Sequence, residues 1–388
     1  MISETQLNES IERLESWIER SGFKGYEPFD GLSSWARPML GGSVFLERVL
    51  MQVVRRSPVN LRPLLGITRK ESTKGSGYFA AGYLNLHKLG RPGFGEKARE
   101  RLVWLDGHKV ERFENHSWSN HFDFSSRGGR YTSQDPIIVW TALIGHTFVD
   151  GYEVLQEPRF LEVAESAARW IMSLPREKTD VGACISYLYD RQSSIHNSNL
   201  LGGGFLARVA KYTQSDEMLS VARDAMLYSC SRIQPDGSWR YGEAEKYHWV
   251  DNFHTGYNLD SLQHYEQATG SSEFRDAAER GLRYYIETMF ESDGCPRYYD
   301  HSKFPVDIQC SGQAIETLAR YRDMDERALK LSREVANWTV EHMQGSNGAF
   351  YYRQGALYTI KTPMLHWGQG TMFKGLTELA LAMKADSV

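Results

Sequence analysis

The stretch from Ile137 to Ser173, IIVWTALIGHTFVDGYEVLQEPRFLEVAESAARWIMS, indicates how the whole chain folds. Its first half, up to Leu155, is apolar on almost every side, which is typical of a buried helix. In its second half the apolar residues from Phe160 to Ile171 recur at intervals of three and four, with charged residues between them. That spacing puts one apolar face on an otherwise polar helix. The stretch therefore predicts a hairpin of a buried inner helix and an amphipathic outer helix.

The same hairpin recurs along the chain, and new units begin near Asn197, Asn252, Asp307 and Trp367. Inner helices are expected over residues 77–89, 137–154, 199–212, 255–268, 309–321 and 369–383. Outer helices are expected over 96–105, 160–173, 219–230, 274–285 and 328–338, and the unpaired N-terminal helix over 4–20 supplies the sixth. Repeats of this kind bury each unit against its neighbours. The sequence predicts an all-α fold, an (α/α)6 toroid or six-hairpin barrel, with the N-terminal helix packed beside the C-terminal inner helix.

Shorter features complete this prediction. Asp236-Gly237, Asp293-Gly294 and Asn347-Gly348 each follow an outer helix and suit a tight turn. Aromatic residues and an arginine come after each pair, so we expect short β-hairpin-like loops at one end of the toroid. A helix over 42–55 does not fit the repeat, and residues 21–70 are interpreted as an insertion or a lid segment. No linker divides the chain, so residues 1–388 are expected to form a single domain.

Composition narrows the class of function. The formal net charge is −4 and the pI is about 6.3, so the chain lacks the basic surface that nucleic acid binding requires. No apolar run is long enough to span a membrane, and Met1–Asn8 is unlike a signal peptide, so a cytoplasmic location is expected. The four cysteines show no CxxC spacing, and the P-loop, GxSxG and Rossmann patterns are missing. We expect no cofactor, and the oligomeric state is left open.

The starts of the inner helices concentrate reactive residue types. In a toroid these helices run parallel, so their N-termini open onto the same end, where partial positive charge and unpaired amides favour anions. Six of the twelve histidines fall at or just before these starts, namely His116, His121, His196, His248, His254 and His366. Aromatic and acidic residues accompany them. We therefore expect one functional cavity at this end of the toroid.

Two sets of candidate site residues follow from this pattern. The candidate catalytic residues are His254, Tyr257, Asp251, His248 and Asp307. The candidate substrate-binding residues are Trp118, His121, Asp123, His196, Asn197, Asn199, Trp249, Asn252, Arg240, Arg297, Gln309, Arg353, His366, Trp367 and Gln369. Helix capping is an alternative role for Asp307, Asn199 and Asn252, and covering the core is an alternative for Trp249 and Trp367. Because His248, Asp251 and His254 share no helical face, no metal site is predicted.

Several motifs resemble those of a known group of proteins. They are GYEPFDGLS over 25–33, HNSNLLG over 196–202, the segment 247–259 and PVDIQ over 305–309. The repeat with its aromatic, His- and Asp-bearing loops resembles the six-hairpin glycosidase-like superfamily, which includes uronyl hydrolases, polysaccharide lyases and uronyl C5-epimerases. The motifs themselves are most similar to VpsJ-like proteins of exopolysaccharide biosynthesis. The resemblance implies a poly- or oligosaccharide partner, and it fixes the family better than the reaction.

Three functions remain open. A uronyl epimerase or lyase abstracts the proton at C5 with a His or Tyr base and needs cations or amides to stabilise the resulting anion; His254, Tyr257, His248, His196 and the arginines 240, 297 and 353 fit this chemistry. A glycoside hydrolase needs two carboxylates, for which Asp251 and Asp307 are candidates, with Asp30 or Asp123 in reserve. The third function is a non-catalytic glycan-binding or scaffold subunit. The surplus of histidine, tyrosine and arginine favours proton abstraction from a uronate-containing saccharide.

Overall fold

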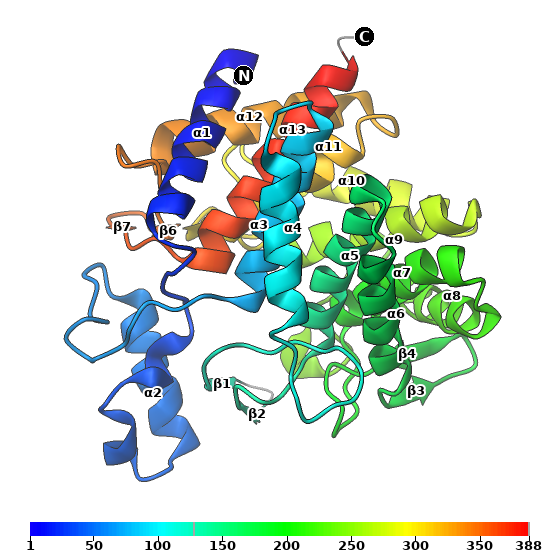
Figure 1. The fold of residues 1–388 in the computed structure, drawn as a ribbon, viewed down its shortest axis with the longest axis horizontal. Helices are drawn as coiled ribbons and strands as arrows, with labels where there is room; N and C mark the ends of the chain where they lie inside the picture. Colours follow the sequence, from blue (N-terminus) through cyan, green and yellow to red (C-terminus); the bar gives the residue numbers. More distant parts are fainter. Residues whose placement is uncertain (127–128, 387–388) are drawn as a thin grey trace.

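Two concentric rings of helices make up most of the protein, in a computed structural model that describes residues 1–126 and 129–386 (Figure 1). The inner ring consists of α3 (Thr73–Lys88), α5 (Ile138–Leu155), α7 (His196–Thr213), α9 (Asn252–Thr269), α11 (Ile308–Arg320) and α13 (Thr371–Asp386). Each inner helix contacts the next, and α13 contacts α3, so the ring is closed. The outer helices are α4 (Phe94–Asp106), α6 (Pro158–Met172), α8 (Asp216–Cys230), α10 (Arg275–Thr288) and α12 (Glu326–Met343). The predicted (α/α)6 toroid is confirmed.

Burial separates the two rings as the apolar pattern predicts. Every residue of α7 from His196 to Ala210 is buried, whereas α6 buries only one face, including Phe160, Val163 and Ala167. Inner helices also approach one another closely. A Cβ atom on Gly375 of α13 would lie 2.4 Å from the carbonyl oxygen of Gly312 in α11, so only glycine permits this approach.

The N-terminal helix α1 (Glu4–Arg20) takes the sixth outer position. It contacts α13, and Lys97 of α4 lies 2.5 Å from Glu15. The turn after α12 packs on it, because a Cβ on Gly348 (φ +93°) would lie 2.2 Å from the carbonyl oxygen of Arg13. In the same way, a Cβ on Gly237 after α8 would lie 2.4 Å from the carbonyl oxygen of Arg280 in α10. The turn that links consecutive hairpins elsewhere in the ring therefore also joins the two ends of the chain.

Short strands lie at the end where the inner helices begin. Antiparallel pairs form between β1 (Phe124–Ser126) and β2 (Gly129–Tyr131) and between β3 (Arg176–Lys178) and β4 (Ala183–Ile185). A three-stranded sheet has the order β5 (Val306–Asp307), β6 (Arg353–Gln354) and β7 (Thr359–Ile360). Short strands were expected at this end, but of the three aromatic and arginine segments that follow the Gly-containing turns, only the one after Asn347-Gly348 overlaps one of these strands, β6. The last inner helix is entered through a π-helical turn, η4 (Leu365–Gly370).

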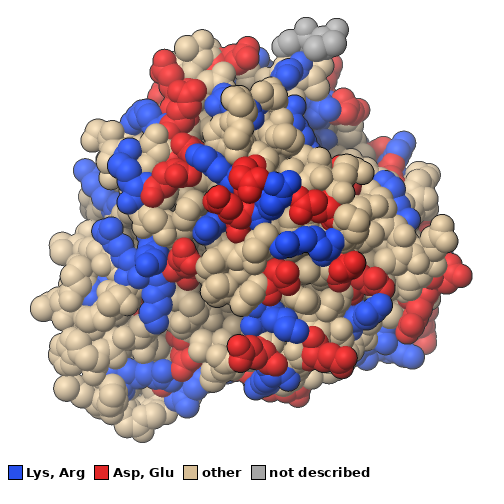
Figure 2. Space-filling model, in the orientation of Figure 1, with Lys and Arg blue, Asp and Glu red and all other residues tan. Residues whose placement is uncertain are grey.

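The predicted insertion forms a separate lobe beside this end. It contains the short helices η1 (Asp30–Ser33) and η2 (Arg37–Leu40) and the helix α2 (Val44–Arg56), which Figure 1 shows apart from the rings. Glu47 of α2 is buried and accepts hydrogen bonds from Ser125 at 2.8 Å and from Arg130 at 3.0 Å, so α2 is tied to the β1–β2 hairpin. Its outer surface is apolar, and the lobe is mostly free of charged side chains in Figure 2.

None of the helices in the described part of the chain combines the length and the apolar character needed to cross a membrane.

Candidate functional site

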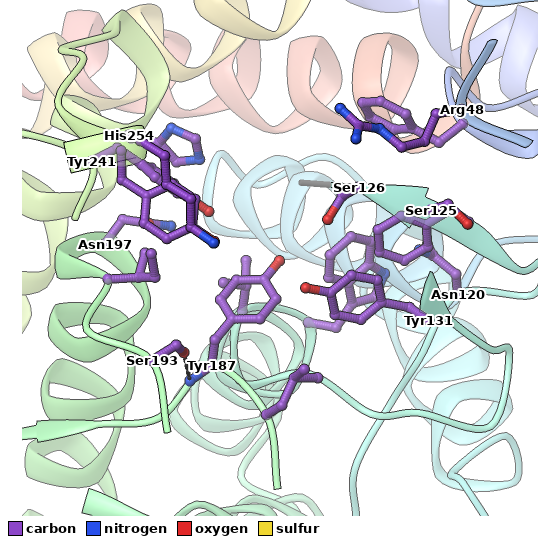
Figure 3. Close-up of a pocket in the computed structure, with 18 of the residues that line it drawn as sticks. Arg48, Asn120, Ser125, Ser126, Tyr131, Tyr187, Ser193, Asn197, Tyr241 and His254 are labelled. Atoms are coloured by element: carbon purple, nitrogen blue, oxygen red, sulfur yellow. Dashed lines mark hydrogen bonds between the residues drawn. The ribbon is translucent and has the colours of Figure 1, made fainter. Parts of the chain in front are cut away.

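A cavity of about 1380 Å³ opens where the inner helices begin. Loops that enter α5, α7, α9, α11 and α13 form its floor and most of its wall, and α2 closes one side with Phe45, Arg48, Gln52 and Arg55. Much of the lining is aromatic, including Trp140, Tyr187, Tyr241, Trp249, Tyr257 and Trp367. Figure 3 shows Tyr241 and His254 on the side of the cavity opposite Arg48, with Tyr187 between them. Flat rings with polar edges are well suited to holding a polar ligand that has apolar faces.

His254 at the start of α9 forms one histidine–carboxylate pair in this wall. Its Nδ1 lies 2.7 Å from Oδ2 of Asp251, and the Nε1 of Trp249 donates to the same oxygen at 3.0 Å. Asp251 is buried and is also the N-cap of α9, because its Oδ1 accepts from the backbone N–H of His254 at 3.1 Å. The imidazole ring packs 4.6 Å from Tyr241 and 4.0 Å from Phe253 between ring centres. Ring position and tautomer are therefore fixed, and Nε2 is the nitrogen left to act on a ligand.

His366 in η4 forms a second such pair. Its Nδ1 lies 2.7 Å from Oε1 of Glu27 in a contact that is not aligned as a hydrogen bond, and its backbone N–H donates to the same oxygen at 3.0 Å. Burial raises the pKa of Glu27, but attraction to His366 and His121 and the contacts that His366 makes with the carboxylate together outweigh it and leave the pKa lowered. Burial lowers the pKa of His366 despite the attraction of Glu27. The pair is therefore a carboxylate beside a neutral imidazole at neutral pH.

Tyr257 lies one helical turn beyond His254, with ring centres 6.3 Å apart. Its hydroxyl is 2.9 Å from the hydroxyl of Tyr78, and Gln309 at the start of α11 donates to it at 3.1 Å. Burial raises the pKa of Tyr257, so the phenol keeps its proton at neutral pH. The sequence makes Tyr257 a candidate base, but this environment suits a hydrogen-bond or proton donor.

Positive charge dominates the ionised groups of the cavity. Arg48, Arg55, Arg56, Lys74, Arg191 and Lys246 line it, against the carboxylates Glu177 and Glu243. Both carboxylates have protein partners: Glu243 lies 2.8 Å from His196 and 3.4 Å from Arg232, and Glu177 accepts from Tyr228 at 3.2 Å. Arg191 is paired in turn with Asp190 at 3.1 Å. The positive charge of the other basic residues, together with the helix N-termini, favours an anionic ligand.

Several polar atoms of the lining have no partner in the protein. Buried oxygen or nitrogen atoms of Gln52, Asn120, Trp140, Asn197, Gln309 and His366 form no hydrogen bond within the described part of the chain. Buried polar groups are nearly always hydrogen-bonded, so a concentration of such atoms in one cavity indicates groups available to a polar ligand.

The predicted site residues are divided between this cavity and its supports. Those that line the cavity are His254, Tyr257, Asn197, Trp249, Gln309, His366 and Trp367. Asp251 lies directly behind His254. Among the candidates expected at one cavity, the following lie outside its lining: His121, His196, His248, Asp307 and Gln369.

The carboxylates expected for a hydrolase are held by other side chains. Asp307 is fully buried and accepts from Nε of Arg353 at 2.9 Å and from Trp367 at 2.8 Å. Asp123 accepts from Arg37 at 2.7 Å, and Asp30 accepts from Arg62 at 2.9 Å. None of these aspartates, nor Asp251, lines the cavity. Asp307, Arg353 and Asp123 are therefore held by other side chains, outside the cavity lining.

The other predicted residues lie outside the cavity lining and contact neighbouring groups of the protein. Trp118 packs in the core and donates to the carbonyl oxygen of Leu105 at 3.0 Å. Amide side chains bind neighbouring backbone: Asn199 binds Ala225, Asn252 binds Met289 and Gln369 binds Phe350. His196 lies 2.8 Å from Glu243, Arg297 pairs with Glu291 at 2.9 Å, His121 packs on Phe122, and exposed His248 lies 3.2 Å from Arg240. A helix start therefore predicts that a residue is near the cavity but not which way it faces.

Sequence reasoning missed Glu27, Lys74 and Trp140. Lys74 was missed because the first inner helix was expected from Gly77, whereas α3 starts at Thr73 with Ser72 as its N-cap. The Ser-Thr pair before Lys74 was the available signal. Glu27 belongs to the segment interpreted as an insertion, and no sequence signal placed it beside η4. In the described part of the chain no three His, Cys, Asp or Glu side chains are grouped as metal ligands.

No family model and no curated protein matches the sequence. Solved structures match the fold. Cellobiose 2-epimerase from Bacillus thermoamylovorans has a TM-score of 0.60 and 10% identity, over 79% of this chain and 88% of that one. An unsaturated glucuronyl hydrolase specific for heparin has a TM-score of 0.60 and 12% identity, over 81% and 87%. An inactive variant of the α-1,6-mannanase of Salegentibacter, with two consecutive aspartates replaced by alanine, has a TM-score of 0.58 and 14% identity, over 81% and 91%.

These likenesses show that the chain has an (α/α)6 toroid fold like that of these proteins. The closer resemblance to VpsJ-like proteins stays a prediction.

Proposed function

We propose that the protein is a carbohydrate-active enzyme that moves the C5 proton of a uronate in a poly- or oligosaccharide, as an epimerase or lyase of exopolysaccharide biosynthesis. One observation carries the proposal: His254 and His366 face one cavity, and each has its Nδ1 within 2.7 Å of a buried carboxylate. The names of three proteins with this fold refer to sugars, which supports a saccharide ligand.

His254 suits the part of the base that removes the proton. Asp251 orients its ring and stabilises the imidazolium that forms when Nε2 accepts a proton. His366 is held on a different inner-helix entry and suits the part of the second acid–base group. In an epimerase one histidine takes the proton from one face of the sugar, and a group that already holds a proton, such as the phenol of Tyr257, returns one to the opposite face. In a lyase the second proton goes instead to the leaving oxygen.

The anion formed between the two proton transfers needs stabilisation. Tyr257 can donate a hydrogen bond to it because its phenol stays protonated. The N-termini of the inner helices and the basic residues of the wall add positive potential. Trp249, Tyr241 and Trp367 offer apolar faces on which sugar rings can stack.

Paired-carboxylate hydrolysis has less support. The aspartates considered for it are bound to Arg353, Arg62, Arg37 or Trp249, and none lines the cavity. The sequence also contains no two consecutive aspartates, unlike the mannanase whose inactive variant was crystallised.

The test is hydrogen exchange at C5. The protein is incubated in D₂O with glucuronate, galacturonate and mannuronate oligosaccharides, and deuterium at C5, unsaturated ends and new reducing ends are measured in parallel. Deuterium with unchanged chain length supports an epimerase, and unsaturated ends support a lyase. New reducing ends without unsaturated sugars and without C5 exchange indicate a hydrolase. Binding with no reaction indicates a glycan-binding role. Either of the last two outcomes overturns the proposal.

A further inference from the structure

Lys74 is a buried cation in the cavity with no anionic partner. It is the second residue of α3, only 3% of it is exposed, and it lines the cavity. Within the described residues its ammonium group forms no hydrogen bond and no ion pair. It lies over aromatic rings instead, with Nζ 4.8 Å from the ring centre of Trp140, 5.4 Å from Tyr78 and 5.7 Å from Tyr257. An isolated buried charge is costly, so such groups are normally paired.

Other buried or half-buried basic side chains in this protein show the usual arrangement. Arg62 binds Asp30 at 2.9 Å, and Arg353 binds Asp307 at 2.9 Å. The ammonium group of Lys374 also lies over the ring of Tyr78, and it is 2.6 Å from a carboxylate oxygen of Glu316. These three side chains lie outside the cavity lining, whereas Lys74 is part of it. The difference indicates that the counter-ion of Lys74 arrives with a ligand.

The groups around Lys74 do not supply a full counter-charge. Glu27 attracts it, but within the described residues no carboxylate oxygen lies within 4 Å of Nζ, and Lys374 repels it. Tyr78 and Tyr257 stay neutral because burial raises their pKa values. Burial consequently lowers the pKa of Lys74 to about 7. An anion placed against Nζ would restore the charged form.

We propose that Lys74 is the anchor for the carboxylate of the uronate residue that reacts. The inference rests on the proposed function and adds the group that selects an acidic sugar. The carboxylate pairs with Nζ among the rings of Trp140, Tyr78 and Tyr257. When the C5 proton moves to histidine, the electrons of the C–H bond delocalise onto this carboxylate, and the ammonium stabilises the added charge. A neutral sugar offers no counter-charge and leaves the ammonium buried and unpaired.

The experiment compares each uronate oligosaccharide of the panel with the same oligosaccharide after reduction of its carboxyl groups to primary alcohols. Binding is measured by titration calorimetry with the full chain. We expect the acidic form to bind the wild-type protein more tightly and Lys74→Met to weaken it more than about 30-fold, with binding of the reduced form unchanged. Lys74→Arg keeps the charge and should retain most of the preference. Lys88→Met removes a lysine from the other, exposed end of α3 and should change neither ligand.

The pH dependence separates an anchoring role from a structural one. Above about pH 7 the free lysine loses its proton, so the wild-type affinity for the acidic form should fall with rising pH by up to about tenfold per unit. Lys74→Arg should show no such fall, because arginine stays charged. Equal binding of acidic and reduced forms, no binding of any acidic form, or an unchanged preference in folded Lys74→Met would each overturn the proposal.

The outcomes also separate this inference from the proposed function. C5 exchange that survives in Lys74→Met without loss of affinity would leave the enzyme assignment intact and remove the anchor. Carboxylate-dependent binding through Lys74 with no exchange in the wild-type protein would keep the anchor and remove the enzyme assignment.

Discussion

Oε1 of Glu27 accepts the backbone N–H of His366 at 3.0 Å and lies 2.7 Å from the Nδ1 of the same residue. This one oxygen joins the segment after the first helix to the turn that begins the last inner helix. The position of a cavity histidine therefore depends on a carboxylate from the opposite end of the chain. The contact that joins the two ends of the chain therefore also positions a side chain of the cavity.

Replacing Glu27 by glutamine should make the fold less stable in a pH-dependent way. The pKa of Glu27 is lowered in the folded protein from 4.5, so its carboxylate stabilises the fold above that pH, and this contribution is lost as the pH falls below it. Unfolding in denaturant should show wild type more stable than Glu27→Gln at pH 7 and a smaller difference at pH 4. A constant difference at both values would contradict this account.

The pair at α9 should be needed for turnover and not for folding. We expect His254→Ala and Asp251→Asn to lower the C5 exchange rate by about 10²–10⁴, because the first removes the base and the second its orienting charge. Asparagine is a good N-cap, so Asp251→Asn should melt close to the wild-type temperature. His248→Ala, an exposed residue outside the cavity lining, is the control and should keep full activity. Full activity in both test variants would move the chemistry away from this segment.

The fold could be read from the sequence because it depends on patterns that repeat. The apolar pattern distinguishes the outer helix α6 from the inner helix α5. The first and last helices each lack a hairpin partner in the sequence, so they were expected to pack together and close the ring. The site depends on side-chain direction, which helix starts do not reveal. Asp251 and Asp307 are both N-caps at inner-helix starts. One supports a cavity histidine and the other binds Arg353, and nothing in the local sequence distinguishes them.

Asp307 and Arg353 should behave as a structural ion pair. Arg353→Met leaves the fully buried Asp307 without its counter-ion, which should cost about 3–5 kcal/mol of stability. Adding Asp307→Asn removes the unpaired charge and should recover most of the loss. Chemical denaturation of the two single variants and the double variant measures both effects. Equal and additive losses would show that the two residues are not coupled.

The turn at Gly348 should hold the ring closed. Gly348→Ala introduces a Cβ 2.2 Å from the carbonyl oxygen of Arg13 at a backbone φ of +93°, so we expect a loss of more than about 1 kcal/mol. Gly270→Ala also has a positive φ, of +70°, but its Cβ meets nothing within 4 Å. It therefore measures backbone strain alone. If the two alanine variants lose the same stability, the turn does not press on α1.

Arg48 on α2 should add affinity for long acidic chains. It is exposed at the cavity wall opposite His254 (Figure 3), so it lies away from the reacting sugar and can reach only neighbouring residues of a polymer. We expect Arg48→Ala to weaken binding of long uronate oligosaccharides several-fold and to leave a disaccharide unaffected, because a rim charge contributes modestly. Added salt should shrink the difference, and Arg48→Lys should restore most of it. An equal loss for short and long ligands would place Arg48 beside the reacting sugar and make α2 part of the catalytic wall.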